Sequence, residues 1–436
     1  MTNEISLPWG EGEAIRLPIP DGWKIKAVLK PNHPAQLPDF RSELDRALKN
    51  PIGMPPLNEF ARRGRSACVL VDDRTRPTPV GAILQSVIAE LNQAGVKDSD
   101  IAIIVAVGAH RAMTEEEIRG QVGADIYKRC RVVNHQYFEK NGLAPVGVTP
   151  THKIPVSLNR LAVEADTVVS IGCIEAHEQA GVGGGYKSIM PGISGLEAIK
   201  ATHTAKFQKP ERISSSGIPK SRCRFRQAVD EAGALLGPKL FIVNAVLDPV
   251  NAVAIVAGDP LAAHEAGRKI YEKMAAVKLD SPADVVIADA RPLDIDLRVS
   301  MKACFNASPA LKPGGLFISV SSAREGLGDL RVPASLPKGT YNTVKHVPMA
   351  IMAPLAMRFN KYPDQAAGTV SMIRLIKAAQ NWLYLTSIAG GIPAFKAMGI
   401  EFFTDAAALI GRAKEIKPNA DVVVLPQAGA SFIAWD

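Results

Sequence analysis

The residues most able to do chemistry lie in one glycine-rich segment between His177 and His203. It begins HEQAGVGGGYKSIMPG and carries Lys187 shortly after its glycines. Three consecutive glycines stand before Tyr186 and the lysine: Gly183, Gly184 and Gly185. Glycine permits positive φ and close backbone approach, and successive free amides can cradle a phosphate. Lys187 can pair with a phosphate, form a covalent adduct or be merely exposed. The segment therefore predicts a ligand site with imidazoles nearby for proton transfer or metal binding.

The glycines of this segment match neither of the common nucleotide-binding fingerprints. No GxxxxGK[ST] sequence is present, so a P-loop is excluded. The spacing is not GxGxxG either, because the glycines lie in a long loop rather than in a tight strand-to-helix turn. Ordinary ATP or NAD binding is therefore disfavoured.

Two shorter polar segments carry further candidates. The loop DDRTRPTP at residues 72–79 contains Asp73 and Arg76. Its prolines fix φ and make the loop stiff, while a guanidinium offers a planar fork for a carboxylate or phosphate. The sequence GAHR at 108–111 places His110 where a neutral imidazole can act as a general base. Taken alone, the first segment is also compatible with a solvated turn, and the second with an ordinary surface histidine.

Buried strands precede all three polar segments. Apolar runs of strand length at 66–71, 101–107 and 166–171 each continue directly into one of them. In open α/β sheets, ligands bind just beyond the carboxyl ends of the strands. We therefore expect His110, His177, Lys187 and His203 to converge on one cleft.

The remaining pattern predicts an α/β fold of two domains, with mostly parallel sheets flanked by helices and the site in the interdomain cleft. We place the domains at residues 1–275 and 276–436, with the last residues as candidates to pack back on the first domain. The region before residue 56 reads as irregular apart from a helix near 40–48. Further helices are expected at 80–93, 114–122 (opened by a Thr114–Glu117 capping box), 196–204, 261–274, 296–305 and 406–413. Further strands are expected at 239–246 and 252–257, which form a hairpin, and at 283–288, 315–320, 401–404 and 421–425.

Composition is that of a globular protein, with 47% hydrophobic and 22% charged residues in a chain of 436. The net charge of +8 is scattered, without a dense basic stretch, so nucleic acid is not an expected partner. A mildly basic balance suits an anionic small substrate or a phosphate-bearing cofactor equally well. The five cysteines form no CxxC pair, and the chain shows no signal peptide and no apolar run long enough to span a membrane. We expect a cytoplasmic protein, and nothing in the sequence predicts its oligomeric state.

With these residues in place, the chain resembles the lactate racemase family over nearly its whole length. The resemblance rests on DDRTRPTP (72–79), GAHRAMTEEE (108–117), NH (134–135) and HEQAGVGGGYKSIMPGISGLEAIKATH (177–203). It implies a nickel-pincer nucleotide, a nicotinic-acid-derived mononucleotide of the pyridinium bis-thiocarboxylate type. Its nickel is held by one carbon and two sulfurs, and a thioamide tethers it to a lysine. Separate maturation enzymes are implied as partners, so protein made without them would lack the cofactor.

The resemblance also implies roles for individual residues. Lys187 would carry the tether and His203 would bind the nickel, which suits imidazole. Asp73 and the three glycines would belong to the cofactor site. His110 and His177 would stand on opposite sides of a 2-hydroxyacid substrate. One takes the hydroxyl proton while the α-hydrogen leaves as hydride, and return of the hydride to the other face inverts the centre. A histidine pKa near neutrality would let each act in either direction.

The substrate residues implied by the resemblance include one departure from the family pattern. Arg76 and Lys302 resemble the family's cationic substrate residues, with Asp73 orienting Arg76, and Trp382 resembles its cleft tryptophan. Where the family usually has a Tyr-Gln pair, this chain has Arg298 and Val299. Arg298 lies four residues before Lys302. We hypothesise that Arg298 recognises a second carboxylate, so that the substrate is not lactate but a dicarboxylate such as malate. The alternative is that Arg298 points into solvent.

Two other functions are compatible with the residues alone. A zinc-dependent hydrolase could use His177, His203 and a carboxylate, although no HExxH pair is present. A non-catalytic protein could bind a phosphate-bearing ligand through the glycine loop, but it would have no use for two histidines facing one cleft.

Overall fold

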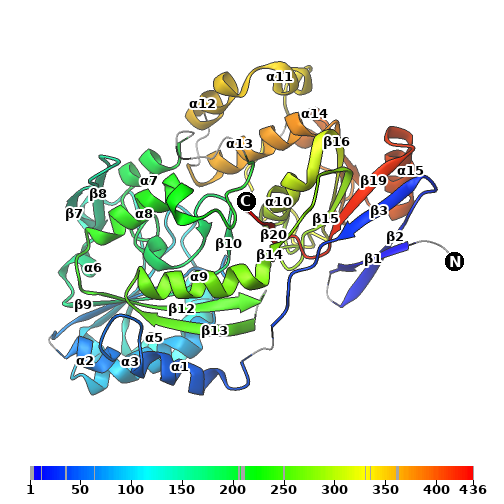
Figure 1. Ribbon diagram of the computed structural model, residues 1–436. Coiled ribbons are helices and arrows are strands. Elements are labelled where there is room, and N and C mark those ends of the chain that lie inside the picture. The colour runs from blue at the N-terminus through cyan, green and yellow to red at the C-terminus, as the bar shows by residue number, and fades with distance from the viewer. Residues whose placement is uncertain are drawn as a thin grey trace.

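The computed structural model consists of two α/β lobes, each built on a six-stranded sheet (Figure 1). It describes residues 4–10, 12–34, 37–62, 64–204, 207, 212–248, 251–328, 330–333, 335–359 and 363–435. Both sheets are nearly or wholly parallel, as the continuous apolar strand sequences predicted. None of the helices in these ranges is long and apolar enough to cross a membrane.

The first lobe contains a sheet in the order β13-β12-β9-β4-β5-β6. Its strands are β4 (Ala67–Val71), β5 (Ile101–Val105), β6 (Arg131–Asn134), β9 (Thr167–Ile174), β12 (Leu240–Asp248) and β13 (Asn251–Gly258). Only the predicted hairpin, β12 with β13, is antiparallel, and its turn residues 249 and 250 lie outside the described ranges. The β4, β9 and β12 strands are buried along their whole length because helices cover both faces of the sheet.

Helices of the first lobe form two layers. They are α1 (Phe40–Lys49), α2 (Leu57–Ala61), α3 (Val80–Gln93), α4 (Glu115–Val122), α5 (Ala124–Arg129), α6 (Arg160–Glu164), α7 (Leu196–Thr202), α8 (Arg224–Ala234) and α9 (Ala262–Ala275). The predicted capping box is confirmed: the Thr114 side chain accepts from the Glu117 amide, and the Glu117 side chain accepts from the Thr114 amide. Two short antiparallel pairs complete the lobe: β7 (Leu143–Val148) with β8 (Pro155–Asn159), and β10 (Ala176–His177) with β11 (Gly181–Val182).

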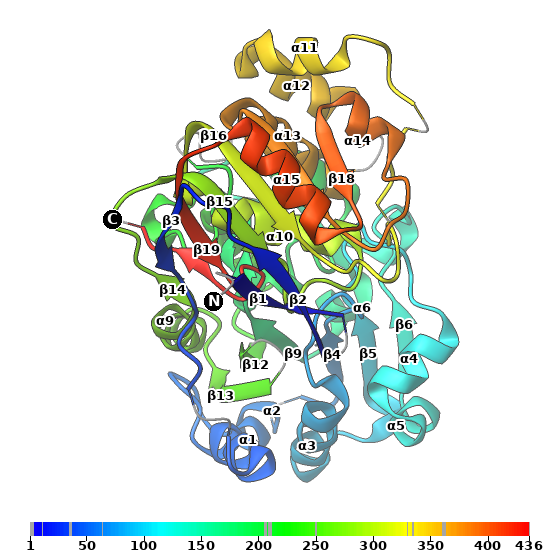
Figure 2. The same ribbon diagram turned by 90° about the vertical axis from the view of Figure 1, so that its right-hand side faces the viewer.

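The second lobe contains an all-parallel sheet in the order β18-β17-β16-β15-β19-β3 (Figure 2). Its strands are β3 (Trp23–Val28), β15 (Ala283–Asp289), β16 (Leu311–Val320), β17 (Asn381–Leu385), β18 (Ile400–Phe403) and β19 (Ala420–Leu425). Its helices are α10 (Leu297–Ala307), α11 (Thr340–His346), α12 (Met349–Phe359), α13 (Pro363–Ala378), α14 (Pro393–Ala397) and α15 (Ala406–Ile416).

Residues 4–10 and 12–30 belong to the second lobe, contrary to the prediction that this region is an irregular part of the first domain. The β1 (Glu4–Trp9) and β2 (Glu13–Pro18) strands form a hairpin that packs on the second sheet, and β3 is the edge strand beside β19. Alternating polar and apolar residues are present in these strands, but β3 pairs with a strand almost four hundred residues away. No local pattern reveals such a pairing.

The end of the chain returns to the first lobe. The β20 strand (Phe432–Ile433) pairs with β14 (Ala276–Val277), and the Phe432 ring lies against Tyr271 of α9. Trp435 donates from its indole nitrogen to the Ser216 carbonyl at 2.8 Å. The two lobes are therefore joined by chain crossings near residues 30, 278 and 430, and the space between them is bounded by the carboxyl ends of strands from both sheets.

A candidate active site between the two lobes

One cavity of about 540 Å³ lies between the lobes and collects most of the predicted site residues. His110, His177, Lys187 and His203 all line it, as the strand-end argument predicted. The second lobe closes the cavity with the beginning of α10, which contributes Arg298, Val299 and Lys302. The other predicted lining residues are Asp73, Arg76, Gly183 and Gly184.

The loop after β4 fixes the orientation of His110. Asp73 is only 5% exposed, and one of its carboxylate oxygens accepts from the amide of Thr75 at 2.9 Å and from its hydroxyl. The other oxygen lies 2.6 Å from His110 Nδ1. Burial alone would raise the pKa of Asp73, but the charge and hydrogen bond of His110 outweigh it and hold the pKa below its usual range. An ionised carboxylate only accepts, so His110 carries a hydrogen on Nδ1, and in its neutral form the lone pair is on Nε2.

Arg76 is held by Glu175 rather than by Asp73. The guanidinium forms a half-buried ion pair with Glu175, which directly follows β9. Burial disfavours the charged guanidinium, but the adjacent Glu175 carboxylate raises the pKa of Arg76 above its usual value. The prediction that Asp73 orients Arg76 is therefore wrong, because the Asp73 carboxylate is taken up by His110 and Thr75. Glu175 was not among the predicted site residues.

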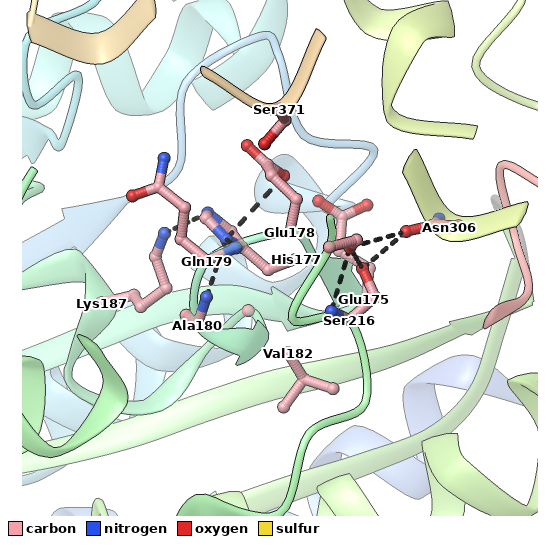
Figure 3. Close-up of polar contacts among 12 residues, drawn as sticks. Glu175, His177, Glu178, Gln179, Ala180, Val182, Lys187, Ser216, Asn306 and Ser371 are labelled. Carbon is pink, nitrogen blue, oxygen red and sulfur yellow. Dashed lines mark hydrogen bonds and ion pairs between the residues drawn. The ribbon is translucent and has the colours of Figure 1, made fainter. Parts of the chain in front are cut away.

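His177 and Lys187 are in direct contact (Figure 3). The Nδ1 atom of His177 accepts from the backbone amides of Gln179 and Ala180, each at 3.2 Å, and its Nε2 lies 2.5 Å from Lys187 Nζ. Burial, followed by the cationic side chains around the site, lowers the pKa of His177 well below its usual value. The expectation of a near-neutral pKa is therefore wrong for this histidine.

The glycine loop is shaped by three residues that the sequence did not single out: Arg226, Asn244 and His264. Arg226, 2% exposed, donates to the carbonyls of Ala180, Val182, Gly183 and Gly184. Asn244 Oδ1 accepts from the Gly185 amide at 2.9 Å, and His264 Nε2 bonds to the Gly183 carbonyl at 2.8 Å. No motif marks Arg226; the only sign is an arginine on the apolar face of α8.

These contacts explain why the loop consists of glycines. A Cβ on Gly184, which has φ +73°, would lie 2.7 Å from Asn244 Oδ1, and one on Gly185 would lie 2.9 Å from the His264 ring. The amides of Gly183 and Gly185 donate to the Glu175 carbonyl and to Asn244. Those two amides are therefore engaged within the protein, and the row of free amides expected from the sequence is not present at these positions.

Replacing Arg226 with methionine is expected to destabilise the protein by about 3–5 kcal/mol, because it removes a buried charge and leaves several buried loop carbonyls without their donor. Urea unfolding measures the change. Arg224→Met, on the exposed side of the same helix, is the matched control and is expected to stay within about 0.5 kcal/mol of wild type. Equal stabilities for the two variants would contradict the role given to Arg226.

His203 stands at the end of α7 with its ring fixed on two sides. Its Nδ1 lies 2.8 Å from the Ile199 carbonyl, to which it donates, and the ring meets Phe225 edge-on at 5.2 Å between centroids. The lone pair is therefore on Nε2. Metal-binding histidines usually donate their other nitrogen to a carbonyl or carboxylate in this way. Within the described ranges, no three His, Cys, Asp or Glu side chains form a group able to hold a metal ion, so the ligand set required by the zinc-hydrolase alternative is not found there.

The second lobe places two cations at the cavity. Asp296 caps α10 by accepting from the Val299 amide at 2.9 Å. Arg298 and Lys302, one turn apart, both line the cavity. Burial, followed by the positive charges of Arg76 and Arg298, lowers the pKa of Lys302. In the part of the chain that is described, no carboxylate forms an ion pair with the Lys302 ammonium.

Trp382 is not part of the site, and its predicted role in substrate binding is wrong. It is 2% exposed on β17, donates to Ser319 Oγ at 2.7 Å and packs on Phe317 and Tyr384. A central strand buries this ring under the helices of the second lobe. His135 is also structural: its Nε2 bonds to the Ser194 carbonyl at 3.0 Å, and burial lowers its pKa to about 4.

Comparisons with known proteins agree with this architecture. Residues 9–215 match the family model of the lactate racemase N-terminal domain. The lactate racemase of Thermoanaerobacterium thermosaccharolyticum is 30% identical over 329 residues, which cover 74% of this chain and 75% of the relative. The lactate racemase of Lactiplantibacillus plantarum is 31% identical over 287 residues, 65% of this chain and 66% of the relative.

Solved structures extend the likeness to the whole chain. The lactate racemase apoprotein from Thermoanaerobacterium thermosaccharolyticum matches with a TM-score of 0.83 at 25% identity, covering 99% of this chain and 100% of that one. A Thermotoga maritima protein shares the fold, with a TM-score of 0.59 at 18% identity over 87% of this chain and 98% of that one. The chain belongs to the lactate racemase family of isomerases.

Proposed function

We propose that this protein racemises or epimerises a 2-hydroxyacid by proton-coupled hydride transfer, using a nickel-pincer nucleotide attached to Lys187. The observation that carries the proposal is the convergence of the His110–Asp73 pair, the Lys187 amine and His203 on one cavity between the lobes. When bound, the nucleotide supplies an acceptor for the hydride that leaves the substrate carbon.

The residues present fit such a group. Lys187 is an amine at the cavity wall whose pKa is held well below its usual value, first by burial and then by Arg76 and Arg226. An uncharged amine is the form that can be acylated. His203 offers one nitrogen toward a metal while its other nitrogen is fixed on Ile199. A single protein ligand of this kind is what a metal needs when its remaining ligands come from the bound group itself.

His110 is the proposed base for the substrate hydroxyl. Its Nε2 lone pair can take the proton, and the buried Asp73 carboxylate stabilises the resulting imidazolium. His177 is the proposed proton donor. Its Nδ1 accepts from two backbone amides, so its hydrogen is on Nε2, where it can donate to a substrate oxygen. The two histidines are therefore not equivalent in this protein.

Lys302 is the proposed partner of the substrate carboxylate, beside the Arg76–Glu175 pair. Arg298, four residues earlier on α10, adds a second cation to the same side of the cavity. A second carboxylate on the substrate would interact more favourably with Arg298 and Lys302 than the methyl group of lactate would. A 2-hydroxydicarboxylate such as malate is therefore the substrate we propose.

The function is tested on protein produced together with the cofactor maturation enzymes. We expect an intact mass above that of the bare chain, stoichiometric nickel and interconversion of malate enantiomers followed by chiral chromatography. Zinc without nickel, or a bare chain mass in protein that racemises malate, would overturn the proposal.

The proposed substrate makes a separate prediction for Arg298. Changing Arg298 to alanine is expected to lower kcat/KM for malate by about 10–100-fold, because a hydrogen bond to a charged group is worth roughly 1.5–3 kcal/mol. Activity on lactate should change little. Arg324→Ala, an exposed position of the same lobe outside the cavity wall, serves as the control. Equal use of malate and lactate after Arg298→Ala, with no loss on malate, would rule out this role.

A further inference from the structure

The hydrogen bonds around His177 determine the charge of its neighbour Lys187. His177 Nδ1 accepts from the amides of Gln179 and Ala180, so it cannot carry a hydrogen. A neutral imidazole has one hydrogen, which must then be on Nε2. Because Nε2 lies 2.5 Å from Lys187 Nζ and donates to it, the lysine has to accept with a lone pair. Only an uncharged amine has that lone pair.

The charges packed around the pair favour the same state. Arg76 approaches from the loop after β4, Arg226 from α8 and Lys302 from α10, while Glu178 is the one carboxylate that acts in the opposite direction among the main charges. Within the described residues, no carboxylate lies within ion-pair distance of Lys187 Nζ. An ammonium group would be removed from much of its water among several cations and without a carboxylate in contact, which is costly.

We propose that His177 is a positioning residue that holds Lys187 as a reactive neutral amine. In turn, Lys187 accepts the Nε2 hydrogen of His177 until the amine is acylated. On acylation, the nitrogen lone pair forms a bond to the acyl carbon, the leaving group departs with its electron pair, and a proton passes from nitrogen to solvent. The amide-type nitrogen that results no longer accepts a hydrogen bond. The Nε2–H of His177 then loses its partner and is released toward the substrate.

This coupling has two steps: His177 keeps Lys187 neutral, and acylation of Lys187 then releases His177. The second step deepens the proposed function and rests on it. A chain without its tether would hold His177 in a closed pair with Lys187, whereas attachment at Lys187 would both load the site and free the histidine. The first step concerns only the untethered chain and can be tested without any racemase activity.

The first test measures acetylation of the full chain, produced without maturation enzymes, by the N-hydroxysuccinimide ester of acetic acid. Peptide mapping compares Lys187 with exposed Lys24 between about pH 6 and 9. We expect Lys187 to react faster than Lys24 at pH 7 and to keep its rate as the pH falls, while Lys24 slows about tenfold per unit. Lys187→Met confirms the assignment of the acetylated peptide. A Lys187 that is unreactive at pH 7, or slows in parallel with Lys24, overturns the proposal.

A matched variant separates the hydrogen bond from simple burial. In His177→Gln, the side-chain oxygen can accept from an ammonium, so the charged lysine is stabilised. Its Lys187 acetylation at pH 7 is expected to fall by about tenfold or more, one pKa unit corresponding to a factor of ten. His177→Phe offers neither donor nor acceptor and is expected to lower the Lys187 rate by a smaller factor, because burial and the nearby cations still disfavour the charged form. If the Phe variant keeps the wild-type rate, or if the Gln and Phe variants slow equally, His177 does not set the state of the amine.

The second test reads the tautomer of His177 directly from its imidazole nitrogen resonances in ¹⁵N-histidine-labelled protein, assigned with His177→Phe. We expect Nε2 protonated and Nδ1 unprotonated in the untethered chain, with no titration between about pH 6 and 8. A protonated Nδ1 would overturn the proposal even if the loaded enzyme proves to be a racemase. Conversely, the expected tautomer would stand if the racemase assay failed.

Discussion

Replacing Asp73 with asparagine is expected to lower kcat for racemisation by about 10²–10⁴-fold, the usual contribution of a positioned general base. The Asp73 carboxylate accepts the Nδ1 hydrogen of His110 at 2.6 Å and so leaves the Nε2 lone pair for the substrate hydroxyl. An asparagine amide can donate to Nδ1 instead and would favour the opposite tautomer, in which Nε2 carries a hydrogen and cannot act as a base. It also removes the charge that stabilises the imidazolium.

The effect is measured as racemisation rate per bound nickel, so that loss of cofactor is not mistaken for loss of catalysis. Asp72→Asn is the matched control because it alters the neighbouring buried carboxylate, whose pKa burial raises to about 6. Asp72 accepts from Thr78 Oγ1 at 2.7 Å and from the Cys173 amide at 3.2 Å, and an asparagine oxygen can do the same. We expect less than about a tenfold change there, because no catalytic histidine depends on it. Similar losses in both variants would show that Asp73 acts through folding of the loop and not through His110.

The elements around the site follow closely from local sequence patterns. The α3 helix begins and ends at the residues that its periodicity predicts, and the Thr114 capping box sets the start of α4. The predicted apolar runs at 66–71, 101–107 and 166–171 correspond to strands β4, β5 and β9. Because these strands are parallel, their carboxyl ends meet at one edge, and this alone places His110 and His177 at a common cavity.

The partners of the site residues could not be predicted in this way. Asp73 and His110 are 37 positions apart, and which of two neighbouring aspartates reaches the histidine depends on how the loop turns. Arg226 reaches the glycine loop from α8, and its role depends on the packing of that helix against β10 and β11. The role of Trp382 was also predicted wrongly from its position in the family resemblance. The neighbouring residues in the sequence do not indicate which face of β17 the ring occupies. Long-range packing decides each of these cases.

Replacing Lys187 with methionine is expected to abolish the covalent mass increase, the retained nickel and racemisation together. Methionine replaces the lysine chain as far as Cε but has no amine to acylate. The change removes a half-buried amine without introducing a charge, so the fold should tolerate it. Intact mass, nickel content and malate racemisation are measured on protein produced with the maturation enzymes and dialysed to remove loosely bound nucleotide.

Lys302→Met is the matched control, since it removes a second cavity lysine of similar burial from the opposite lobe. It is expected to keep the mass increase and the nickel while KM for malate rises, because Lys302 is the proposed partner of the substrate carboxylate and does not carry the tether. The contrast assigns each lysine by a different readout: attachment for Lys187 and substrate affinity for Lys302. Retention of the full mass increase in Lys187→Met would move the tether to another residue. Loss of the adduct in Lys302→Met as well would mean that both lobes must be intact before the amine can react.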